Sequence, residues 1–492
     1  MPSIMIQGCG SDVGKTVLVA GMCRLLAARG FNVRPFKPQN MSNNAAVTPD
    51  GGEVGRSTAL QALACRVPPT VDMNPILLKP QSDVGAQLIV RGRRVGDFHA
   101  RSHGHTKREL LDVALASYRT LTRDAEWIVV EGAGSPAETN LRQHDIANMG
   151  FAHAADIPVV LVGDINRGHV IASLVGAHAV LDDADRARIR GFIINKFRGD
   201  QSLFDAGIAT IEQRTGWESL GIVPWLPSTK WLPEEDAMRL ELAAREASGS
   251  NQRVLRIGAL RLKHIANFDD FDPLLHEPHV EFRFIDPREP LPLDLDLLIL
   301  PGSKATIADL EVLHEYGWEH ELHAYLRRGG RILGICAGLQ MLGHVVRDPE
   351  RIEGERSEIE GFRLLDLETE MTASKLLREV QGTASGTGAR VSGYEMHVGR
   401  CKGPALSRPM IRFDDGTADG AVAPNGRVFG CHVHGLFHSA DLRAALLASL
   451  GGRSAAHDHD EQIHSALDEI AATLERSLSI DRLLDIARGE TR

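Results

Sequence analysis

The sequence predicts an α/β protein of two domains, each built on a largely parallel β-sheet with helices on its faces. In the first half, helical stretches separate four apolar runs that suit buried strands: "SIMIQ" (3–7), "WIVVEG" (127–132), "IPVVLVGDI" (157–165) and "IRGFIINKF" (189–197). A second series of the same kind begins at "VLRIGAL" (254–260) and reaches "RILGICAGLQML" (331–342). Strands that alternate with helices favour parallel sheets, whose ligands bind at the carboxyl ends of the strands.

A change in composition separates the two series. Residues 233–253, "PEEDAMRLELAAREASGSNQR", pass from a charged helical stretch to a small polar segment, which is typical of a domain boundary. We therefore expect a first domain over 1–233, a linker over 234–252 and a second domain over 253–440. The remaining residues, 441–492, are expected to form a helical and exposed tail.

The bulk composition of the 492 residues is that of a globular protein with small-molecule partners. A formal net charge of -10 at pH 7, with no basic block, argues against nucleic acid as a partner. No apolar run reaches membrane-spanning length, so no membrane partner is expected, and the N-terminus lacks the pattern of a signal peptide. The six cysteines form no CxxC pair, so we expect reduced thiols and a cytoplasmic location.

The stretch "GCGSDVGKT" (8–16) follows the first strand directly and opens a helix. It has the parts of a phosphate-binding loop, although the spacing from Gly8 to Gly14 is one residue longer than the general fingerprint. Backbone N–H groups of such a loop bind phosphate oxygens, Lys15 would neutralise the β- and γ-phosphates, and Thr16 would offer a hydroxyl to Mg²⁺. A glycine-rich turn without a ligand is the alternative. The candidate nucleotide-binding residues here are Gly8, Gly10, Ser11, Asp12, Val13, Gly14, Lys15 and Thr16.

Charged and polar residues at other strand ends could complete this site. Glu131 ends a strand, where a carboxylate can bind Mg²⁺ directly or through water, and Asp50 and Glu53 in "TPDGGEVG" could add further metal ligands. Lys37 in "FKPQN" could bring a second cation to a phosphate or an acidic substrate, and Asn195 in "INKF" could contact adenine. Solvated turns and a lysine at a strand end would explain the same residues without a ligand.

A candidate nucleophile lies in the second series. Cys336 stands between the glycines of "GICAG", after a buried strand and before a helix, in a sharp turn that exposes a thiol and favours its thiolate. The N–H groups of Gly302, in "LILPGSK", and of Ala337 could bind an oxyanion, and His434 in "CHVHGLF" is the candidate base. A buried structural cysteine is the alternative for Cys336. A metal chelate is the alternative for His434, because His432 would share its strand face.

Several longer segments of the first half resemble known families. The phosphate loop, together with "KP" at 37–38 and "EG" at 131–132, resembles the dethiobiotin synthetase type of ATPase, which phosphorylates a carboxylate or carbamate. More specifically, the chain is similar to the cobyric acid synthase family of cobalamin biosynthesis over residues 1 to about 440. The segments that carry this similarity are "PFKPQNMSNNAAVTPDGGEVGR", "DMNPILLKPQSDVGAQ", "VVEGAGSPAETNLRQHDIANMG" and "DINRGHVIASL". Two positions differ from the family pattern, with Cys9 in place of threonine and Asn166 in place of a carboxylate.

The second half is similar to the triad-type, or class I, glutamine amidotransferases of the cobyric acid and cobyrinate diamide branch, in which "HG-x-F" carries the histidine. "GYEMHVGR" (393–400) also matches this branch, with Glu395 and His397 either in a glutamine pocket or in a structural role at a sheet edge. Ordinary members place a glutamate two residues after the histidine, but this sequence has Leu436 there. The resemblance therefore implies a dyad of Cys336 and His434.

Taken together, the resemblances imply a glutamine-dependent amide ligase that acts through an acyl phosphate. ATP and Mg²⁺ are the implied cofactors, glutamine and a corrinoid carboxylate are the implied partners, and a homo-oligomer stays open. The substrate would be adenosylcobyrinic acid a,c-diamide, amidated at its b, d, e and g carboxylates. The long "KPQN" and "MNPILLKP" segments favour this substrate.

Two alternatives to this function stay open. The first is cobyrinic acid a,c-diamide synthase or another glutamine-dependent carboxylate amidoligase. The second is a ParA-like ATPase switch with a degenerate glutamine-sensing domain. The switch is disfavoured because Cys9 and Gly10 offer no lysine and because Cys336 and His434 are both intact.

Overall fold

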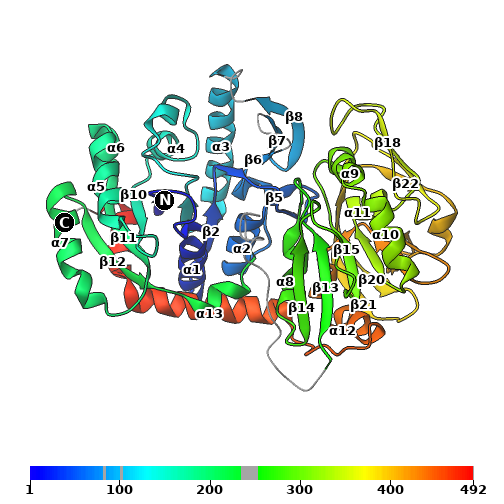
Figure 1. Cartoon of the computed structure of the whole chain (residues 1–492). Coiled ribbons are helices and arrows are strands. Elements are labelled where there is room, and N and C mark those ends of the chain that lie inside the picture. The colour runs from blue at the N-terminus through cyan, green and yellow to red at the C-terminus, as the bar shows by residue number, and fades with distance from the viewer. Residues whose placement is uncertain (81–84, 100–103, 234–252, 491–492) are drawn as a thin grey trace. The chain divides into compact units, whose positions relative to one another are not determined.

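The computed structural model describes residues 1–80, 85–99, 104–233 and 253–490 and divides the chain into two compact units (Figure 1). The first unit comprises Met1–Ser42, Thr48–Pro233 and Ile463–Arg492, and the second comprises Asn43–Val47 and Glu234–Gln462. The linker expected over 234–252 lies outside the described residues.

The first unit is organised by a six-stranded sheet of order β12-β11-β10-β1-β9-β2, in which every pairing is parallel. Met5 of the central strand β1 pairs with Val159 on one side and Val130 on the other. Such strands are apolar throughout because helices cover both faces of the sheet. The bounds are β1 (Ser3–Gly8), β2 (Val33–Phe36), β9 (Trp127–Glu131), β10 (Val159–Asp164), β11 (Ile189–Phe197) and β12 (Glu218–Pro224).

Two apolar clusters lie on the faces of this sheet. Ile4 and Ile6 belong to one cluster and Met5 to the other, as the two-residue period of a strand requires. The helices of this unit are α1 (Lys15–Ala28), α2 (Arg56–Ala64), α3 (Gly104–Asp124), α4 (Met149–Ala154), α5 (Val170–Val180), α6 (Asp183–Arg188), α7 (Asp205–Thr215), most of α13 (His459–Ser477) and α14 (Ile480–Arg488). A smaller sheet contains β3 (Gln39–Met41), β6 (Ile76–Pro80), β7 (Gly85–Val90) and β8 (Arg93–His99), and the short strand β5 spans Glu53–Gly55.

The second unit contains a six-stranded sheet of order β14-β13-β15-β16-β26-β25, parallel except for the pairing of β25 with β26. The predicted α/β fold, with a parallel sheet in each half of the chain, is confirmed. The bounds are β13 (Leu255–Leu260), β14 (Val280–Ile285), β15 (Leu297–Leu300), β16 (Ile332–Ile335), β25 (Ala421–Val422) and β26 (Val428–Cys431), with helices α8 (Asp272–Leu275), α9 (Thr306–Glu315), α10 (Trp318–Arg327), α11 (Ala337–Met341) and α12 (Ala440–Ser449).

Two further sheets complete the second unit. One has the order β24-β23-β20-β21-β27 and is antiparallel throughout, and the other has the order β18-β17-β19-β22. The strand expected to carry both His432 and His434 is interrupted. The strand β26 of the six-stranded sheet ends at Cys431, and β27, which begins at Val433, belongs to the antiparallel sheet. The bounds of their strands are β17 (Val345–Arg347), β18 (Glu358–Glu360), β19 (Glu368–Glu370), β20 (Leu376–Ala384), β21 (Arg390–His397), β22 (Arg400–Lys402), β23 (Ile411–Phe413), β24 (Ala418–Asp419) and β27 (Val433–His434). The short strand β4 (Ala45–Val47) belongs to neither sheet.

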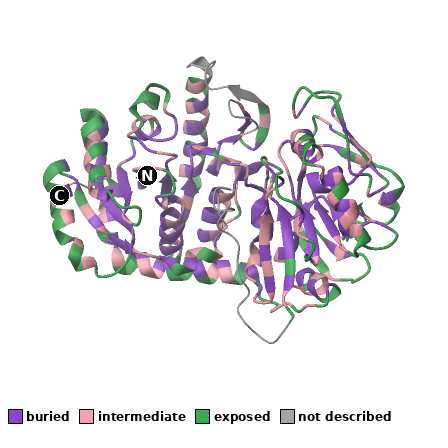
Figure 2. Cartoon of the chain, in the orientation of Figure 1, coloured by how far each residue is buried: buried purple, intermediate pink, exposed green. Residues whose placement is uncertain are grey.

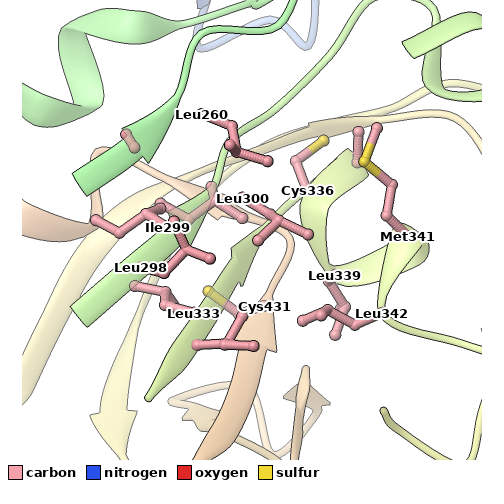
Figure 3. Packing of buried hydrophobic residues seen from close by; sticks show 14 of the residues in the cluster. Leu260, Leu298, Ile299, Leu300, Leu333, Cys336, Leu339, Met341, Leu342 and Cys431 are labelled. Carbon is pink, nitrogen blue, oxygen red and sulfur yellow. The ribbon is translucent and has the colours of Figure 1, made fainter. Parts of the chain in front are cut away.

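A single apolar cluster forms the core of the second unit. Its strand residues are buried along β13, β15 and β16. The strand β13 is mostly purple in Figure 2. Figure 3 shows Cys336 as a member of this cluster, together with Leu300, Leu333 and Leu339. Within the part of the chain that the structure describes, no helix is both long enough and apolar enough to span a membrane.

The C-terminal segment is helical, as expected, but it is not the exposed tail that the sequence analysis expected. Leu467, Ile470 and Leu474 of α13 are fully buried and belong to a cluster that also contains Leu18 of α1. The three residues follow helical spacing and form an apolar stripe. The expectation that residues 441–492 are exposed is therefore wrong, because this amphipathic stripe buries one face of α13.

The contact between α13 and α1 predicts a stability effect. A Cβ atom at Gly21 would lie only 2.5 Å from Leu474 Cδ1, so the two helices approach closely at this point. Leu474→Ala is expected to lower the free energy of unfolding by about 2–5 kcal/mol, because it opens a cavity in the core. Urea denaturation measures this change, and Glu469→Ala on the exposed face of α13 is the control. Equal stability of the two variants would contradict the packing role of α13.

Candidate active sites

The phosphate loop joins the carboxyl end of β1 to the first turn of α1. Gly14 has φ 96 and caps α1 without a side-chain hydrogen bond to the helix end, so backbone N–H groups of the first turn face the loop. A Cβ atom at Gly14 would lie 2.3 Å from Asn195 Nδ2, whereas a Cβ atom at Gly10 would meet nothing within 4 Å. The loop is therefore braced at Gly14 and open at Gly10, a geometry that suits an anion at a helix N-terminus.

Polar contacts hold the loop in this form. Lys15 is buried, and its Nζ donates to the carbonyl oxygens of Gly10 at 3.0 Å and Gly134 at 3.1 Å. Asn195 Nδ2 donates to the Val13 carbonyl oxygen at 2.8 Å, so the residue expected to contact adenine also supports the loop backbone. Lys15 thus lies across the loop, where it can bind phosphate oxygens.

The exposed turn of the loop carries Ser11 and Asp12. Asp12 adopts φ 57 and accepts a hydrogen bond from Arg167 at 3.1 Å. Asn166, where the family pattern has a carboxylate, accepts from Arg198 Nε at 3.1 Å. Arg167 therefore pairs with this turn. Burial raises the pKa of the Cys9 thiol, in the same loop, to about 12 despite the charge of Lys15.

Glu131 lies at the centre of a polar cluster beside the loop and contacts three other side chains. It is buried at the end of β9, and its Oε1 accepts from Thr16 Oγ1 at 2.8 Å and lies 3.1 Å from Lys37 Nζ. Gln61 Nε2 donates to its other oxygen. The structure thus brings Thr16, Lys37 and Glu131 together beside Lys15, as the sequence analysis expected. A hydroxyl and a carboxylate are oxygen ligands that suit Mg²⁺.

The other two candidate metal ligands have different partners. Glu53 is buried and forms an ion pair with Lys79 Nζ at 2.6 Å. Asp50 lies on an exposed turn and accepts a hydrogen bond from Thr48. Among the described residues, no group of three or more His, Cys, Asp or Glu side chains is arranged to hold a metal ion. Their role as metal ligands therefore stays a prediction.

In the second unit, Cys336 lies in a strained turn between β16 and α11. Its φ of 53 and ψ of -110 are rare for a residue with a side chain. A Cβ atom at Gly334 would lie 2.6 Å from the backbone of Gly338, and one at Gly338 would lie 1.9 Å from the Leu300 carbonyl oxygen. The glycines of "GICAG" are therefore required by close backbone contacts, and the turn that they permit presents the thiol at the sheet edge.

His434 is the basic partner of Cys336. Burial opposes ionisation of the thiol, but the charge of His434, a hydrogen bond with its ring and one from the Ala337 N–H lower the pKa of Cys336 below its ordinary value. Burial likewise opposes protonation of the imidazole, but Asp270 and Cys336 raise the pKa of His434 to about 10. Both shifts favour a thiolate beside an imidazolium over a neutral thiol beside a neutral imidazole.

Asp270 makes this pair a triad, so the expected dyad is wrong. Its Oδ2 lies 2.7 Å from His434 Nδ1, its Oδ1 accepts from the Gly435 N–H at 2.6 Å, and both side chains are about 2% exposed. Asp270 belongs to a turn of 3-10 helix, Phe268–Phe271, and lies 164 residues before His434. The sequence signal that could have pointed to Asp270 is the pair of aspartates in "NFDDF" (267–271), which follows the first strand of the second series.

The proposed oxyanion residues flank this triad. A Cβ atom at Gly302 would lie 2.9 Å from His434 Cε1, so only glycine fits against the ring. Ala337 follows Cys336 directly, and its N–H donates a hydrogen bond to the Cys336 sulfur. Tyr394 stacks on His434 with ring centroids 5.5 Å apart. The structure thus brings Gly302, Ala337, Cys336 and His434 together.

His432 does not join His434 in a shared metal site. Its Nδ1 lies 2.7 Å from Asp419 Oδ1, whereas His434 uses Asp270. Glu395 and His397, the candidate glutamine-pocket residues, lie on β21, where Glu395 pairs in register with Val433. This segment therefore lies beside the strand that carries His434.

Two family models match the chain. The CobQ/CobB/MinD/ParA nucleotide binding domain matches residues 4–238. The CobB/CobQ-like glutamine amidotransferase domain matches residues 256–442. The first match contains the phosphate loop and Glu131, and the second contains Asp270, Cys336 and His434. The chain thus combines a nucleotide-binding domain with a glutamine amidotransferase domain.

Curated relatives match over nearly the whole chain. The cobyric acid synthase of Caulobacter sp. (strain K31) is 59% identical over 487 residues, which cover 99% of this chain and 100% of the relative. The cobyric acid synthase of Rhizorhabdus wittichii is 55% identical over 99% of this chain and 100% of the relative. That of Methylorubrum populi is 54% identical over 99% of both chains. The chain therefore belongs to the cobyric acid synthase family.

Proposed function

We propose that the chain transfers the amide nitrogen of glutamine to the b, d, e and g carboxylates of adenosylcobyrinic acid a,c-diamide, with hydrolysis of ATP. The observation that carries this proposal is a complete cysteine triad in the same chain as a phosphate loop. Family membership supports the corrinoid substrate. A cytoplasmic site of action fits the six cysteines, all of which are free thiols.

The triad releases ammonia from glutamine. The Cys336 thiolate attacks the carboxamide carbon, and the N–H groups of Gly302 and Ala337 stabilise the oxyanion that forms. The carbon–nitrogen bond then breaks, and His434 gives its proton to the leaving ammonia. His434 next takes a proton from water, which cleaves the glutamyl thioester and regenerates Cys336. Asp270 keeps the imidazole oriented and stabilises its protonated form.

The phosphate loop activates the carboxylate that will accept this ammonia. Its backbone N–H groups and Lys15 bind the phosphates of ATP while a carboxylate oxygen of the corrinoid attacks the γ-phosphorus and ADP leaves. Ammonia then attacks the acyl carbon of the acyl phosphate, and inorganic phosphate leaves. Thr16 and Glu131, with Asp50 and Glu53 as further candidates, would hold Mg²⁺, which supplies charge neutralisation during phosphoryl transfer. Lys37 would bind the γ-phosphate or the carboxylate.

Two ligand-specific roles, one in each site, rest on further residues. Asn195 would contact adenine, since it lies on β11 and already contacts the loop. Glu395 and His397 would line the glutamine pocket, since they lie on the strand beside β27. The test of the whole proposal is mass spectrometry of the corrinoid after incubation with ATP, Mg²⁺ and glutamine. Conversion of the a,c-diamide to a hexaamide supports it, whereas turnover only of cobyrinic acid would instead support the a,c-diamide synthase.

Replacement of the phosphate-loop lysine should stop amidation from either nitrogen source. Lys15→Ala is expected to lower corrinoid amidation at least about 100-fold with glutamine and with ammonium alike, because carboxylate activation precedes both. Glutamine hydrolysis should persist. The matched control is Lys230→Ala, which removes an exposed lysine of the same unit. Near-normal amidation from ammonium in Lys15→Ala would refute the assignment of the loop.

Replacement of the nucleophile should separate the two nitrogen sources. Cys336→Ser is expected to abolish amidation with glutamine and to retain it with excess ammonium at mildly alkaline pH, because a serine hydroxyl is a far weaker nucleophile than the thiolate. His434→Ala should behave in the same way, and His432→Ala should be milder. The assay is corrinoid product formation with each nitrogen source. Full glutamine-dependent activity in Cys336→Ser would exclude this residue as the nucleophile.

Replacement of Asp270 tests the third member of the triad. Asp270→Asn should lower kcat/KM for glutamine hydrolysis on the order of 10²- to 10⁴-fold at neutral pH and spare ammonium-dependent amidation. Without the carboxylate the pKa of His434 falls and that of Cys336 rises. The rate at which iodoacetamide inactivates the enzyme, measured against pH, should therefore begin to fall on acidification at a higher pH than in the wild type.

The control for this substitution is Asp460→Asn, which removes a similar contact to Nδ1 of the partly exposed His438, 3.2 Å away. This variant should keep the wild-type pH profile. An unchanged profile in Asp270→Asn would mean that Asp270 has only a structural role.

A further inference from the structure

A second cysteine, histidine and aspartate lie together in the second unit. Cys401 is on β22 and is partly exposed, and its Sγ lies 3.6 Å from His432 Nε2. His432 Nδ1 lies 2.7 Å from Asp419 Oδ1, and the His432 N–H donates to Asp419 Oδ2 at 2.6 Å. We call these three residues the second triad. The mechanism above gives these three residues no role.

The second triad repeats the contacts of the first. In each, one carboxylate oxygen contacts histidine Nδ1, and the other oxygen accepts a backbone N–H from the same segment, that of His432 or of Gly435. The opposite ring nitrogen then faces a cysteine sulfur. This arrangement fixes the ring and leaves Nε2 to act on the thiol.

The charge of His432 favours a nucleophilic sulfur. Burial opposes protonation of the ring, but Asp419 and Cys401 raise the pKa of His432 well above its ordinary value. These contacts favour the protonated ring, which carries hydrogens on both nitrogens, so that Nε2 can donate to Cys401 Sγ. The Thr369 hydroxyl lies 3.3 Å from the same sulfur and can donate as well. An adjacent imidazolium and hydrogen-bond donors stabilise a thiolate, which is the reactive form of cysteine.

His397 supplies a second, independent sign of a reactive site. Its ring stacks on His432 with centroids 4.0 Å apart, and its side chain is only 10% exposed. Burial and the charge of His432 lower the pKa of His397, so it is neutral. Within the described residues, neither of its ring nitrogens makes a hydrogen bond, and the nearest carboxylate oxygen, Glu395 Oε1, lies 3.8 Å from Nε2. A buried imidazole in this state can bind a small polar molecule that approaches the second triad.

We propose that Cys401 is a second nucleophilic thiol, which reacts with small electrophiles and in particular with hydrogen peroxide. The sulfur attacks one peroxide oxygen, the oxygen–oxygen bond breaks, and the hydroxide that leaves takes the proton of His432 Nε2 to become water. Cys401 is oxidised by two electrons to a sulfenic acid, and peroxide is reduced. His432 regains a proton from solvent.

The experiment compares Cys401 with Cys9 in the unaltered full-length chain. Both thiols are partly exposed, but burial raises the pKa of Cys9 to about 12. Iodoacetamide, and separately hydrogen peroxide followed by dimedone, are applied at neutral pH, and peptide mass spectrometry gives the rate at each cysteine. Cys401 should react at least about tenfold faster than Cys9 in the folded protein and at a similar rate in urea. Equal rates in the folded protein would overturn the proposal.

Two variants test whether the second triad causes this reactivity. His432→Asn and Asp419→Asn should each lower the labelling rate of Cys401 about tenfold. His438→Asn, at a histidine whose Nδ1 lies 3.2 Å from the exposed Asp460, should not change it. Circular dichroism checks that each variant is folded. Full reactivity of Cys401 in folded His432→Asn would also overturn the proposal, and the comparison with Cys9 decides it if a variant does not fold.

Discussion

Both candidate sites depend on one constraint, which is that all strands of a parallel sheet end at the same edge. In the first unit, β1 lies between β9 and β10, so the phosphate loop and Glu131 follow adjacent strands. In the second unit, β13, β15, β16 and β26 are neighbours in that order, and the segments after them carry Asp270, Gly302, Cys336 and His434. Groups that are distant in sequence therefore meet at one edge.

A second constraint is that buried charges need partners. Removal of one partner from a buried ion pair costs about 3–5 kcal/mol, because the remaining charge stays buried alone. Asp270 is paired with His434 and a backbone N–H, and Glu131 with Thr16, Lys37 and Gln61. These contacts fix the orientation of each group, so much of the geometry that catalysis requires is built into the fold.

Local patterns could be predicted from the sequence, and distant pairings could not. The phosphate loop and "GICAG" are strand–turn–helix units whose geometry depends on glycines a few residues away, and both form as expected. Asp270 was missed because nothing near His434 in the sequence points to it. The interruption at His432 was missed because its apolar neighbours continue the strand pattern, although the chain passes into another sheet there. The burial of α13 was missed although its periodicity was present.

Leu436 explains why the missing glutamate does not disable the triad. It occupies the position where related amidotransferases carry the third carboxylate, but its side chain is 1% exposed and packs in the apolar core. An ionised glutamate at this position would lose its hydration and would compete with Asp270 for the imidazole. Asp270 already contacts His434 Nδ1 and the Gly435 N–H. In this chain the carboxylate that contacts the histidine therefore comes from another segment, so a triad is defined by the contact and not by the spacing.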